Sequence, residues 1–451
     1  MTDGLKLTRY VVVSDRLTVS RTGSDERVVF STRSGAVLIV PHLVWLCVAE
    51  DRREQLPPAV LQRFIDARIL VPAAEDELGA IVRENLEAIE DHELLYQVVQ
   101  PTAWCQLDCH YCGQEHSAQH LDHSGQSAFI ERVRERLATR KYRHLKIGWF
   151  GAEPLAGLGA MRSLSARAEA LAREFDCTYS AQIVTNGLAL TAEVARELVE
   201  QLHIDEAEVT LDGLAADHDR RRFTKGGNGS FDRIFRNLRA VAAATELGIK
   251  IRCNVDRSNV EGVAPLIEAL AEAGLAERVA FYTSPVYSWG NDADRGSLGK
   301  SEYAEYEMEW FALQFRLGFT LALIPPRRKI VCMSVQRDAE VVDAFGTTYN
   351  CTEAPYVPAY GTPNLYQIGA SGGRRAPGLT APPPAAAERL RGFNEQLLAR
   401  EHASCGECPM LPVCGGHCPK AWFEGHEPCP SAKTNMRQRL NFLYALREMG
   451  A

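Results

Sequence analysis

The middle of the chain, from about residue 96 to 325, alternates short apolar runs with longer stretches whose apolar residues recur every three or four positions. Short apolar runs between turn residues are typical of buried strands, and the longer repeat is typical of helices. The predicted strands are Leu95–Val99, Leu145–Phe150, Tyr179–Val184, Ala207–Leu211, Lys250–Val255 and Arg278–Thr283. The predicted helices are 126–140, 159–174, 191–202, 231–246 and 260–273. This order predicts an α/β domain with a parallel sheet of six β/α units.

Residues 1–95 have a different pattern and are expected to form a separate small domain. The predicted strands are Arg9–Val13, Glu26–Ser31 and Ala36–Val40, and the predicted helices are His42–Ala49 and Ala59–Ile69. Leu70–Pro72 is expected to end this unit. The stretch 75–93 is rich in Asp and Glu and predicts an acidic, solvated connecting helix. A last helix is predicted over 432–448.

Length, charge and cysteine content narrow the class of protein. A chain of 451 residues allows two or three domains. The net charge of −8 argues against a general nucleic-acid binder. The first residues lack the apolar stretch of a signal peptide, and no run approaches transmembrane length, so we expect a cytoplasmic protein without a membrane partner. In that compartment thirteen cysteines indicate metal ligands in preference to disulfides.

The strongest chemical signal is the loop that follows the strand Leu95–Val99. Cys105, Cys109 and Cys112 have C-x3-C-x2-C spacing. Three thiolates on one loop can hold three irons of a cubic [4Fe–4S] cluster and leave the fourth iron open to an external ligand. A zinc knuckle or unrelated thiols are the alternatives.

With Tyr111 beside the last cysteine, this loop resembles the cluster loop of the radical S-adenosylmethionine (SAM) enzymes. The resemblance implies a partial (β/α)6 barrel at residues 96–325 whose open iron binds SAM. It also implies reductive cleavage of SAM to a 5′-deoxyadenosyl radical that abstracts hydrogen from a substrate. In such barrels the chemistry gathers at the carboxyl ends of the strands, where this loop falls.

Turns after the later strands resemble further motifs of that family. Phe150–Leu155 is similar to the family's Gly-Gly-Glu-Pro turn, with Ala152 in place of the second glycine. Val209–Gly213 is similar to a Ser-Leu-Asp-Gly motif, with Thr210 as the hydroxyl. The pattern around His218, Arg222 and Ser230 matches another motif. The cofactor contacts that the resemblance implies are Tyr111, Gly151, Ala152, Glu153, Asn186, Thr210, Asp212, Arg222 and Asn254. Glu153 would hold the SAM amino group, and Arg222 could pair with its carboxylate.

The last third of the chain carries seven more cysteines. Cys332 is followed by Gly346-x4-Cys351, then by Cys405-x2-Cys408-x5-Cys414-x3-Cys418, and finally by Cys429. This order resembles the SPASM extension of radical SAM peptide maturases, which would occupy residues 326–451 and hold two auxiliary [4Fe–4S] clusters. A zinc ribbon would explain only Cys405 and Cys408. Between the two cysteine blocks, Gly369–Pro384 is predicted to be a mobile excursion.

The resemblance also implies how the seven ligands divide. Cys405, Cys408, Cys414 and Cys429 would close one cluster, and Cys332, Cys351 and Cys418 would supply three ligands to the other. Since no eighth cysteine is found nearby, one iron of that second cluster is expected to be open or held by another group. A substrate thiolate could bind there, which favours thioether chemistry over carbon–carbon bond formation.

Strands followed by a helical pair make residues 1–95 similar to the winged-helix peptide-recognition domain of peptide-modifying enzymes. The hypothesis is a peptide maturase with three [4Fe–4S] clusters, a ribosomally made precursor peptide whose leader binds residues 1–95, and an electron donor such as flavodoxin or ferredoxin. Glu353 is a positional candidate for an acid or base. The alternatives are oxidation of Cys or Ser in a protein substrate, as in sulfatase maturation, and a non-catalytic peptide-binding or electron-transfer protein. Residues 1–95 could also be a structural cap.

Overall fold

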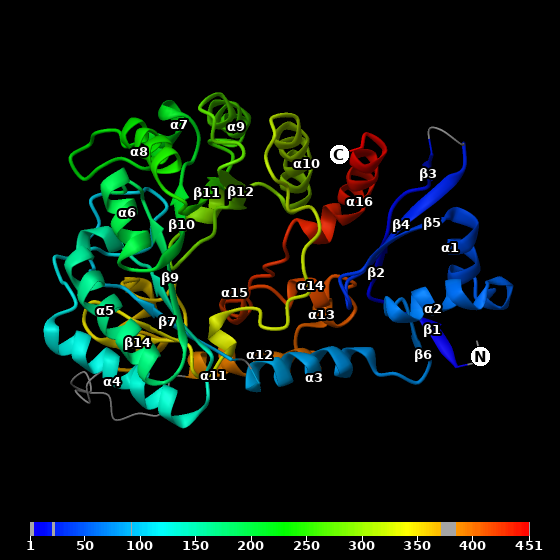
Figure 1. The fold of residues 1–451 in the computed structure, drawn as a ribbon, viewed down its shortest axis with the longest axis horizontal. Helices are drawn as coiled ribbons and strands as arrows, with labels where there is room; N and C mark the ends of the chain where they lie inside the picture. The colour runs from blue at the N-terminus through cyan, green and yellow to red at the C-terminus, as the bar shows by residue number, and fades with distance from the viewer. Residues whose placement is uncertain (1–3, 20–22, 92, 371–384, 451) are drawn as a thin grey trace.

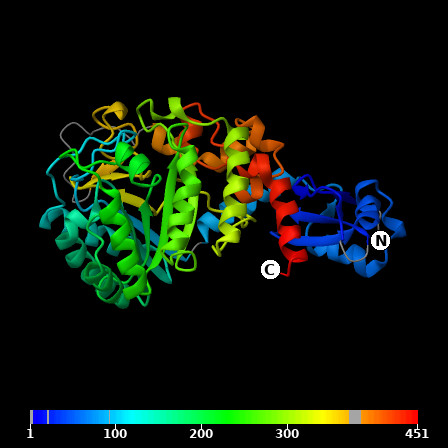
Figure 2. The same ribbon diagram turned by 90° about the horizontal axis from the view of Figure 1, so that it is seen from above.

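The computed structural model describes residues 4–19, 23–91, 93–370 and 385–450. Three parts stand in a row: the central α/β domain, the C-terminal extension and the N-terminal domain. Most helices of the extension lie between the other two parts in both views, whereas its strands join the sheet of the central domain (Figures 1 and 2). The excursion predicted over Gly369–Pro384 lies outside the described residues from position 371 onward.

Six parallel strands of the central domain stand in the order β12-β11-β10-β9-β8-β7. They are β7 (Leu94–Val99), β8 (His144–Trp149), β9 (Thr178–Thr185), β10 (Ile204–Thr210), β11 (Gly248–Val255) and β12 (Val279–Pro285). The helices that connect or follow them are α4 (His123–Thr139), α5 (Leu158–Glu174), α6 (Ala192–Glu200), α7 (Ala215–Arg221), α8 (Phe231–Ala244), α9 (Val263–Glu272) and α10 (Lys300–Arg316). The helices cover one face of the curved sheet (Figure 1). This arrangement confirms the six predicted β/α units.

Alternation along the strands separates the apolar face of the sheet from its polar face. In β11, Ile249, Ile251 and Cys253 are buried in the core under the helices. Lys250 and Arg252 point to the other face, because neighbouring residues of a strand alternate between faces. There Lys250 pairs with Glu206 of β10 at 2.7 Å. The interior of the partial barrel is therefore polar, and its apolar core lies between sheet and helices.

The extension continues the same sheet beyond β7. β13 (Glu340–Val342) pairs with β7 in parallel, and β14 (Thr347–Tyr349) and β15 (Gln367–Ala370) add antiparallel strands. The remaining helices are α11 (Ala385–Arg391), α12 (Phe393–Leu398), α13 (Ala403–Gly406), α14 (Leu411–Cys414), α15 (Pro419–Phe423) and α16 (Ala432–Glu448). The predicted boundary at residue 326 therefore divides the central domain from the extension along the sequence. In the structure, β13 joins the extension to the central sheet.

The N-terminal domain contains two antiparallel sheets, and the larger one is packed on both faces. The larger sheet has four strands, β2 (Val11–Val13), β3 (Leu17–Thr18), β4 (Asp25–Ser31) and β5 (Val37–Pro41). The smaller one pairs β1 (Leu5–Leu7) with β6 (Leu70–Pro72). Val29 of β4 faces α1 (His42–Ala49) and α2 (Pro58–Asp66), in a core with Val48 and Phe64. Val28 and Phe30 face the extension and pack with Met436 and Leu440 of α16.

Two expectations about this region were wrong. α3 (Glu77–Glu90), predicted to be solvated, buries Leu78, Ile81 and Val82 against Phe393 and Leu411 of the extension. Glu87 and Glu90 lie on its exposed side, so composition alone concealed an amphipathic helix. The second predicted helix ends at Asp66, not Ile69, and Leu70–Pro72 is a strand paired with β1.

Candidate active site

A cavity of about 200 Å³ opens at the carboxyl ends of the barrel strands. Its lining comes from the loop after β7, from the ends of β8 to β11, from the loop after β12 and from the extension. Of the residues expected at the site, the lining includes Cys105, Cys109, Tyr111, Cys112, Gly151, Ala152, Asn186, Thr210, Arg222, Asn254 and Glu353. Glu153 and Asp212 lie behind this wall, fully buried. The fold thus gathers side chains that are far apart in sequence.

The cysteine loop is fixed by backbone hydrogen bonds to the segment after α7. The N–H of Asp108 donates to the Phe223 carbonyl at 2.9 Å. Burial raises the pKa of the Cys105 thiol to about 11 and that of Cys109 to about 12. These thiols therefore stay protonated unless a cation, such as iron, binds them.

No three His, Cys, Asp or Glu side chains converge closely enough to hold a single metal ion anywhere in the described ranges. In an iron–sulfur cube each cysteine binds a different iron, so the three thiols do not have to meet at one point. The cluster on this loop stays a prediction.

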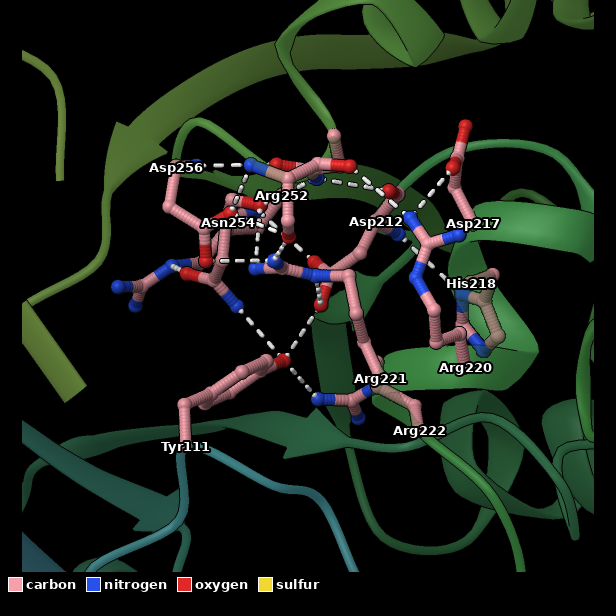
Figure 3. A network of polar contacts seen from close by, with 12 residues as sticks. Tyr111, Asp212, Asp217, His218, Arg220, Arg221, Arg222, Arg252, Asn254 and Asp256 are labelled. Atoms are coloured by element: carbon pink, nitrogen blue, oxygen red, sulfur yellow. Dashed lines mark hydrogen bonds and ion pairs between the residues drawn. The ribbon is translucent and has the colours of Figure 1, made fainter. Parts of the chain in front are cut away.

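Tyr111 is the centre of a buried hydrogen-bond network (Figure 3). Its hydroxyl donates to Asp212 Oδ2 at 2.7 Å, and accepts from Arg222 Nη1 at 2.6 Å and from Asn254 Nδ2 at 3.1 Å. Burial raises the pKa of this phenol well above its usual value, so the hydroxyl keeps the proton that it donates. Tyr111 thereby fixes two side chains that face the cavity, a role that its position beside a cysteine did not predict.

Asp212 supports this network from behind. Its Oδ1 accepts from the Asn254 N–H at 2.9 Å, and its Oδ2 lies 3.4 Å from Arg221 Nε. Arg221 in turn donates to Asp256 Oδ2 at 2.6 Å and is almost completely buried. The sequence reasoning identified Arg222 but missed Arg221, which neutralises the buried carboxylates and holds β10 and β11 together.

His218 is held as a neutral ring within the same network. Its Nδ1 accepts from the Asp212 N–H at 3.2 Å, so the proton of the neutral ring is on Nε2, which faces Ser230 Oγ at 2.9 Å. Ser230 donates to the Arg222 carbonyl at 2.5 Å. Burial lowers the pKa of His218 to about 4. This chain of hydrogen bonds fixes the backbone that carries Arg222.

The turn after β8 approaches the cavity with its backbone. Gly151 has φ +78°, and a Cβ there would lie 2.2 Å from Gln100 Cδ, so the turn requires glycine at this position. Ala152 also has a positive φ, 44°, and its N–H donates to Gln114 Oε1 at 3.1 Å. Alanine thus occupies a left-handed conformation where the family motif has glycine.

Glu153 joins the ends of β8 and β9. Its Oε1 accepts from Leu155 N–H at 2.9 Å and from Thr185 Oγ1 at 2.7 Å, and its Oε2 accepts from Asn186 N–H at 2.7 Å. Burial raises the pKa of this carboxyl. Its contact with a cofactor stays a prediction, and in the structure its oxygens orient the Asn186 turn that lines the cavity.

A second polar group lines the cavity and joins the Tyr111 network through Asn254. Arg252 Nε donates to Asn254 Oδ1 at 2.8 Å, and Arg252 Nη1 lies 3.9 Å from Glu208 Oε1. Glu353 of the extension lines the same space and, among the described residues, has no hydrogen-bond partner for its carboxylate. Burial raises the pKa of Glu353. Sequence reasoning missed Arg252 and Glu208, although their alternation with apolar residues in β10 and β11 was the available signal.

Room for a substrate lies beside this cavity. A second cavity of about 570 Å³ shares Val286, Tyr287 and Trp289 with the first and reaches Cys429 of the extension. These three residues follow β12 in a loop without a regular pattern, so the sequence did not single them out.

The seven cysteines of the extension form two groups. The pKa of Cys405 is raised to about 12 by burial and then by charges on its neighbours Cys414, Cys429 and Cys408. The pKa of Cys351 is raised well above its usual value by burial and then by Cys332 and Cys418. Because such effects require short separations, the fold brings together the four and the three cysteines that the resemblance grouped.

Comparisons with known proteins show which proteins this chain is similar to. Residues 99–255 match the Radical SAM superfamily. The chain carries a domain of the radical SAM superfamily. The matched region runs from the last residue of β7 to the end of β11 and contains the cysteine loop, Asp212, Arg222 and Asn254. A 77-residue stretch is 40% identical to the mycofactocin maturase MftC of Mycobacterium tuberculosis, covering 17% of this chain and 18% of that protein.

Two further comparisons match longer parts of this chain. An uncharacterised protein of Synechocystis sp. is 26% identical over 149 residues, 31% of this chain and 36% of that protein. The matched regions therefore span 18% and 36% of the length of these two curated relatives. The solved structure of native anSMEcpe with bound AdoMet has the same fold, with a TM-score of 0.57 and 16% identity over 79% of this chain and 98% of the other. A structure of anSMEcpe with AdoMet and the Cp18Cys peptide has a TM-score of 0.56.

Helices long and apolar enough to span a membrane are absent from the described ranges.

Proposed function

We propose that this protein is a radical SAM peptide maturase that cleaves SAM reductively and modifies a ribosomally made precursor peptide by hydrogen abstraction. The observation that carries the proposal is the set of three cysteines lining one cavity with Arg222 and Asn254 at the mouth of a radical SAM barrel. All thirteen cysteines are free thiols, which agrees with a cytoplasmic protein that uses cysteine to bind metal.

The residues of the cavity fit SAM. Arg222 is fixed by Tyr111 through Nη1, while its buried Nε has no hydrogen-bond partner in the described structure. A buried unpaired donor is costly, and the carboxylate of a bound amino acid would satisfy it. Asn254 and Thr210 present further polar groups, and the turn at Gly151 presents backbone. The [4Fe–4S] cluster on Cys105, Cys109 and Cys112 supplies the electron for SAM cleavage when bound.

The two cysteine groups of the extension support two auxiliary clusters. Four cysteines match the four positions of one cube, and three leave one position of the other unfilled. Glu353 lies near Cys351 and influences the pKa of its thiol. A substrate thiolate, or Glu353 itself, could supply the missing ligand or take up a proton. Thioether formation is therefore our first choice of chemistry, followed by a carbon–carbon crosslink.

The N-terminal domain offers a free sheet edge for a leader peptide. β5 pairs with β4 alone among the described strands, so its outer edge can accept an added strand. Beside it, α1 has the apolar sequence His-Leu-Val-Trp-Leu-Cys-Val-Ala, yet only Val48 is buried. Leu43 is 74% exposed. A helix that is apolar on all sides is normally covered, which supports a partner on this face.

Oxidation of a Cys or Ser in a protein substrate is the second candidate, supported by the fold similarity to anSMEcpe. The test is to incubate reconstituted protein with SAM, reductant and a candidate precursor peptide that contains cysteine. Release of 5′-deoxyadenosine with a crosslinked peptide, two hydrogens lighter, supports the first proposal. A peptide containing a formylglycine would support the second. A protein that binds peptide without releasing 5′-deoxyadenosine would contradict both.

A further inference from the structure

Two residues after Cys418, the extension carries a fully buried lysine on α15. The side chain of this residue, Lys420, is 1% exposed. Its Nζ donates to Tyr360 Oη at 2.6 Å and to both carboxylate oxygens of Glu424 at 2.8 Å. Because an ammonium has three N–H donors, all of them are satisfied, and the cation is held in one position.

Three aromatic rings enclose the ammonium of Lys420. Its Nζ lies 4.5 Å from the ring centroids of Trp289 and Tyr360 and 5.3 Å from that of Tyr366. The faces of aromatic rings attract cations. Tyr366 is fully buried, and its hydroxyl donates to Glu424 Oε1 at 2.7 Å. This cage therefore keeps a positive charge inside the protein, where an unpaired charge would be costly.

The cage packs against the three-cysteine group of the extension. Tyr366 and Cys351 belong to one apolar cluster, and Cys332 packs against the same cluster. Burial raises the pKa of the Cys351 and Cys418 thiols, and the charge of Lys420 counteracts this rise in both. The ammonium is therefore close enough to stabilise negative charge on this group.

The carboxylates near Lys420 offset its charge only in part. The side chain of Glu424 is 21% exposed, so water screens its carboxylate more than the buried ammonium. Glu353 acts on Cys351 in the opposite direction, with a smaller effect than that of Lys420. The field of these side chains at the cysteine group is therefore positive.

We propose that the caged ammonium of Lys420 sets the reduction potential of the auxiliary cluster on Cys332, Cys351 and Cys418 by stabilising its reduced form. The inference rests on the proposed function, which assigns a [4Fe–4S] cluster to these thiols. One-electron reduction adds one negative charge to such a cluster, and a fixed cation beside it favours the more negative state. The electron comes from an external reductant, which is oxidised by one electron, and no bond is made or broken. Lys420 thus acts through the cysteine group.

The test is to measure the reduction potentials of the two auxiliary clusters in reconstituted protein that has alanine at positions 105, 109 and 112. Lys420→Met keeps a long side chain and removes the charge. It should lower one of the two potentials by about 59 mV or more, which corresponds to a tenfold change in the equilibrium constant of one-electron reduction. A redox titration with dithionite, followed by electron paramagnetic resonance, measures both potentials.

A second variant shifts the same potential in the opposite direction. Glu424→Gln keeps an oxygen that can accept from Lys420 and Tyr366, but it removes the negative charge that opposes the ammonium. The potential that K420M lowers should therefore rise in E424Q. If K420M loses iron, E424Q decides the question, and an unchanged potential in E424Q would overturn the proposal.

The matched control is Lys433→Met in the four-cysteine group. Lys433 Nζ lies 3.3 Å from Cys429 Sγ, so K433M should lower the other potential and leave unchanged the one that K420M shifts. A K420M variant that shifts neither potential, shifts both equally or raises one would overturn the role of Lys420 alone. Absence of a cluster from Cys332, Cys351 and Cys418 would overturn it together with the auxiliary clusters of the proposed function.

Discussion

At the scale of single residues, the account depends on side chains whose roles are set by burial. Cysteine spacing predicted three residues that line the cavity, because spacing along one loop is a local property. The polar side chains were harder to foresee, since Arg221, Arg252 and Glu208 act through partners on other strands. Their positions follow from the parallel packing of β10 and β11, which no single stretch of sequence contains.

Ala152 gives the first prediction. Its φ of 44° places an alanine in the left-handed region, where a Cβ costs about 1 kcal/mol or more. Ala152→Gly removes that cost but adds chain entropy in the unfolded state, so the free energy of unfolding should rise by about 0.5 kcal/mol. Chemical denaturation measures it. Ala240→Gly, at an exposed position inside α8, should instead lose about 1 kcal/mol. If A152G lowers the free energy of unfolding as much as A240G does, the strain in the Ala152 turn is contradicted.

His218 gives a prediction about pH. Its pKa is lowered from 6.5 to about 4, so between these values the unfolded chain binds more protons than the folded chain. Its contribution to stability is present above about pH 6.5 and is lost as pH falls through this window. Between pH 7 and pH 5 the loss should be about 2 kcal/mol. In the His218→Asn variant, the loss of unfolding free energy between pH 7 and pH 5 should be smaller by that amount. If unfolding free energy depends on pH as steeply in the variant as in the wild type, His218 does not titrate this way.

At the scale of elements, the sequence predicted the regular parts closely. The predicted helix at His42–Ala49 and the one over 432–448 have the bounds found for α1 and α16. All six barrel strands were found within three residues of their predicted ends. Strands β1, β3 and β13 to β15 were missed, because two to four residues carry no readable period. α10 was also missed, although Tyr303, Trp310 and Leu313 give it a buried stripe.

The exposed apolar helix α1 gives a prediction about the leader peptide. Leu43→Glu places a charge on the face beside the β5 edge and should weaken binding of the labelled precursor peptide by about tenfold, roughly the cost of burying an apolar side chain. SAM cleavage without peptide should be unchanged. Leu398→Glu, at a half-exposed position of α12, is the matched control and should bind peptide normally. Equal peptide affinity in L43E and wild type would favour the structural-cap hypothesis.

At the scale of the whole molecule, the N-terminal domain and the extension share a core. Tyr10 packs with Phe393, Cys405 and Leu411, and Thr32 Oγ1 donates to the Pro409 carbonyl at 2.6 Å. The sequence could not show this, because the contacts join residues separated by nearly the full length of the chain. The N-terminal domain therefore covers part of the extension around Cys405.

Deletion of residues 1–95 should reveal this second role. The deletion exposes Met436 and Leu440 of α16 and removes α3 from beneath α12. The thermal midpoint of the shortened protein should be several degrees lower than that of the full chain. The shortened protein should also contain about 4 fewer irons per chain, the content of one cluster. Thermal unfolding and iron analysis measure these changes, with L43E as the full-length control. A stable deletion that keeps all its iron would contradict the shared core.

The central claim is that Cys105, Cys109 and Cys112 hold the cluster that cleaves SAM. The most direct measurement is 5′-deoxyadenosine formed from SAM and dithionite by wild type and by the triple alanine variant, with iron counted in both. The account predicts release by the wild type and none by the variant, which should keep about 8 of about 12 irons because these thiols serve one cube. Continued 5′-deoxyadenosine formation by the triple variant would contradict the account.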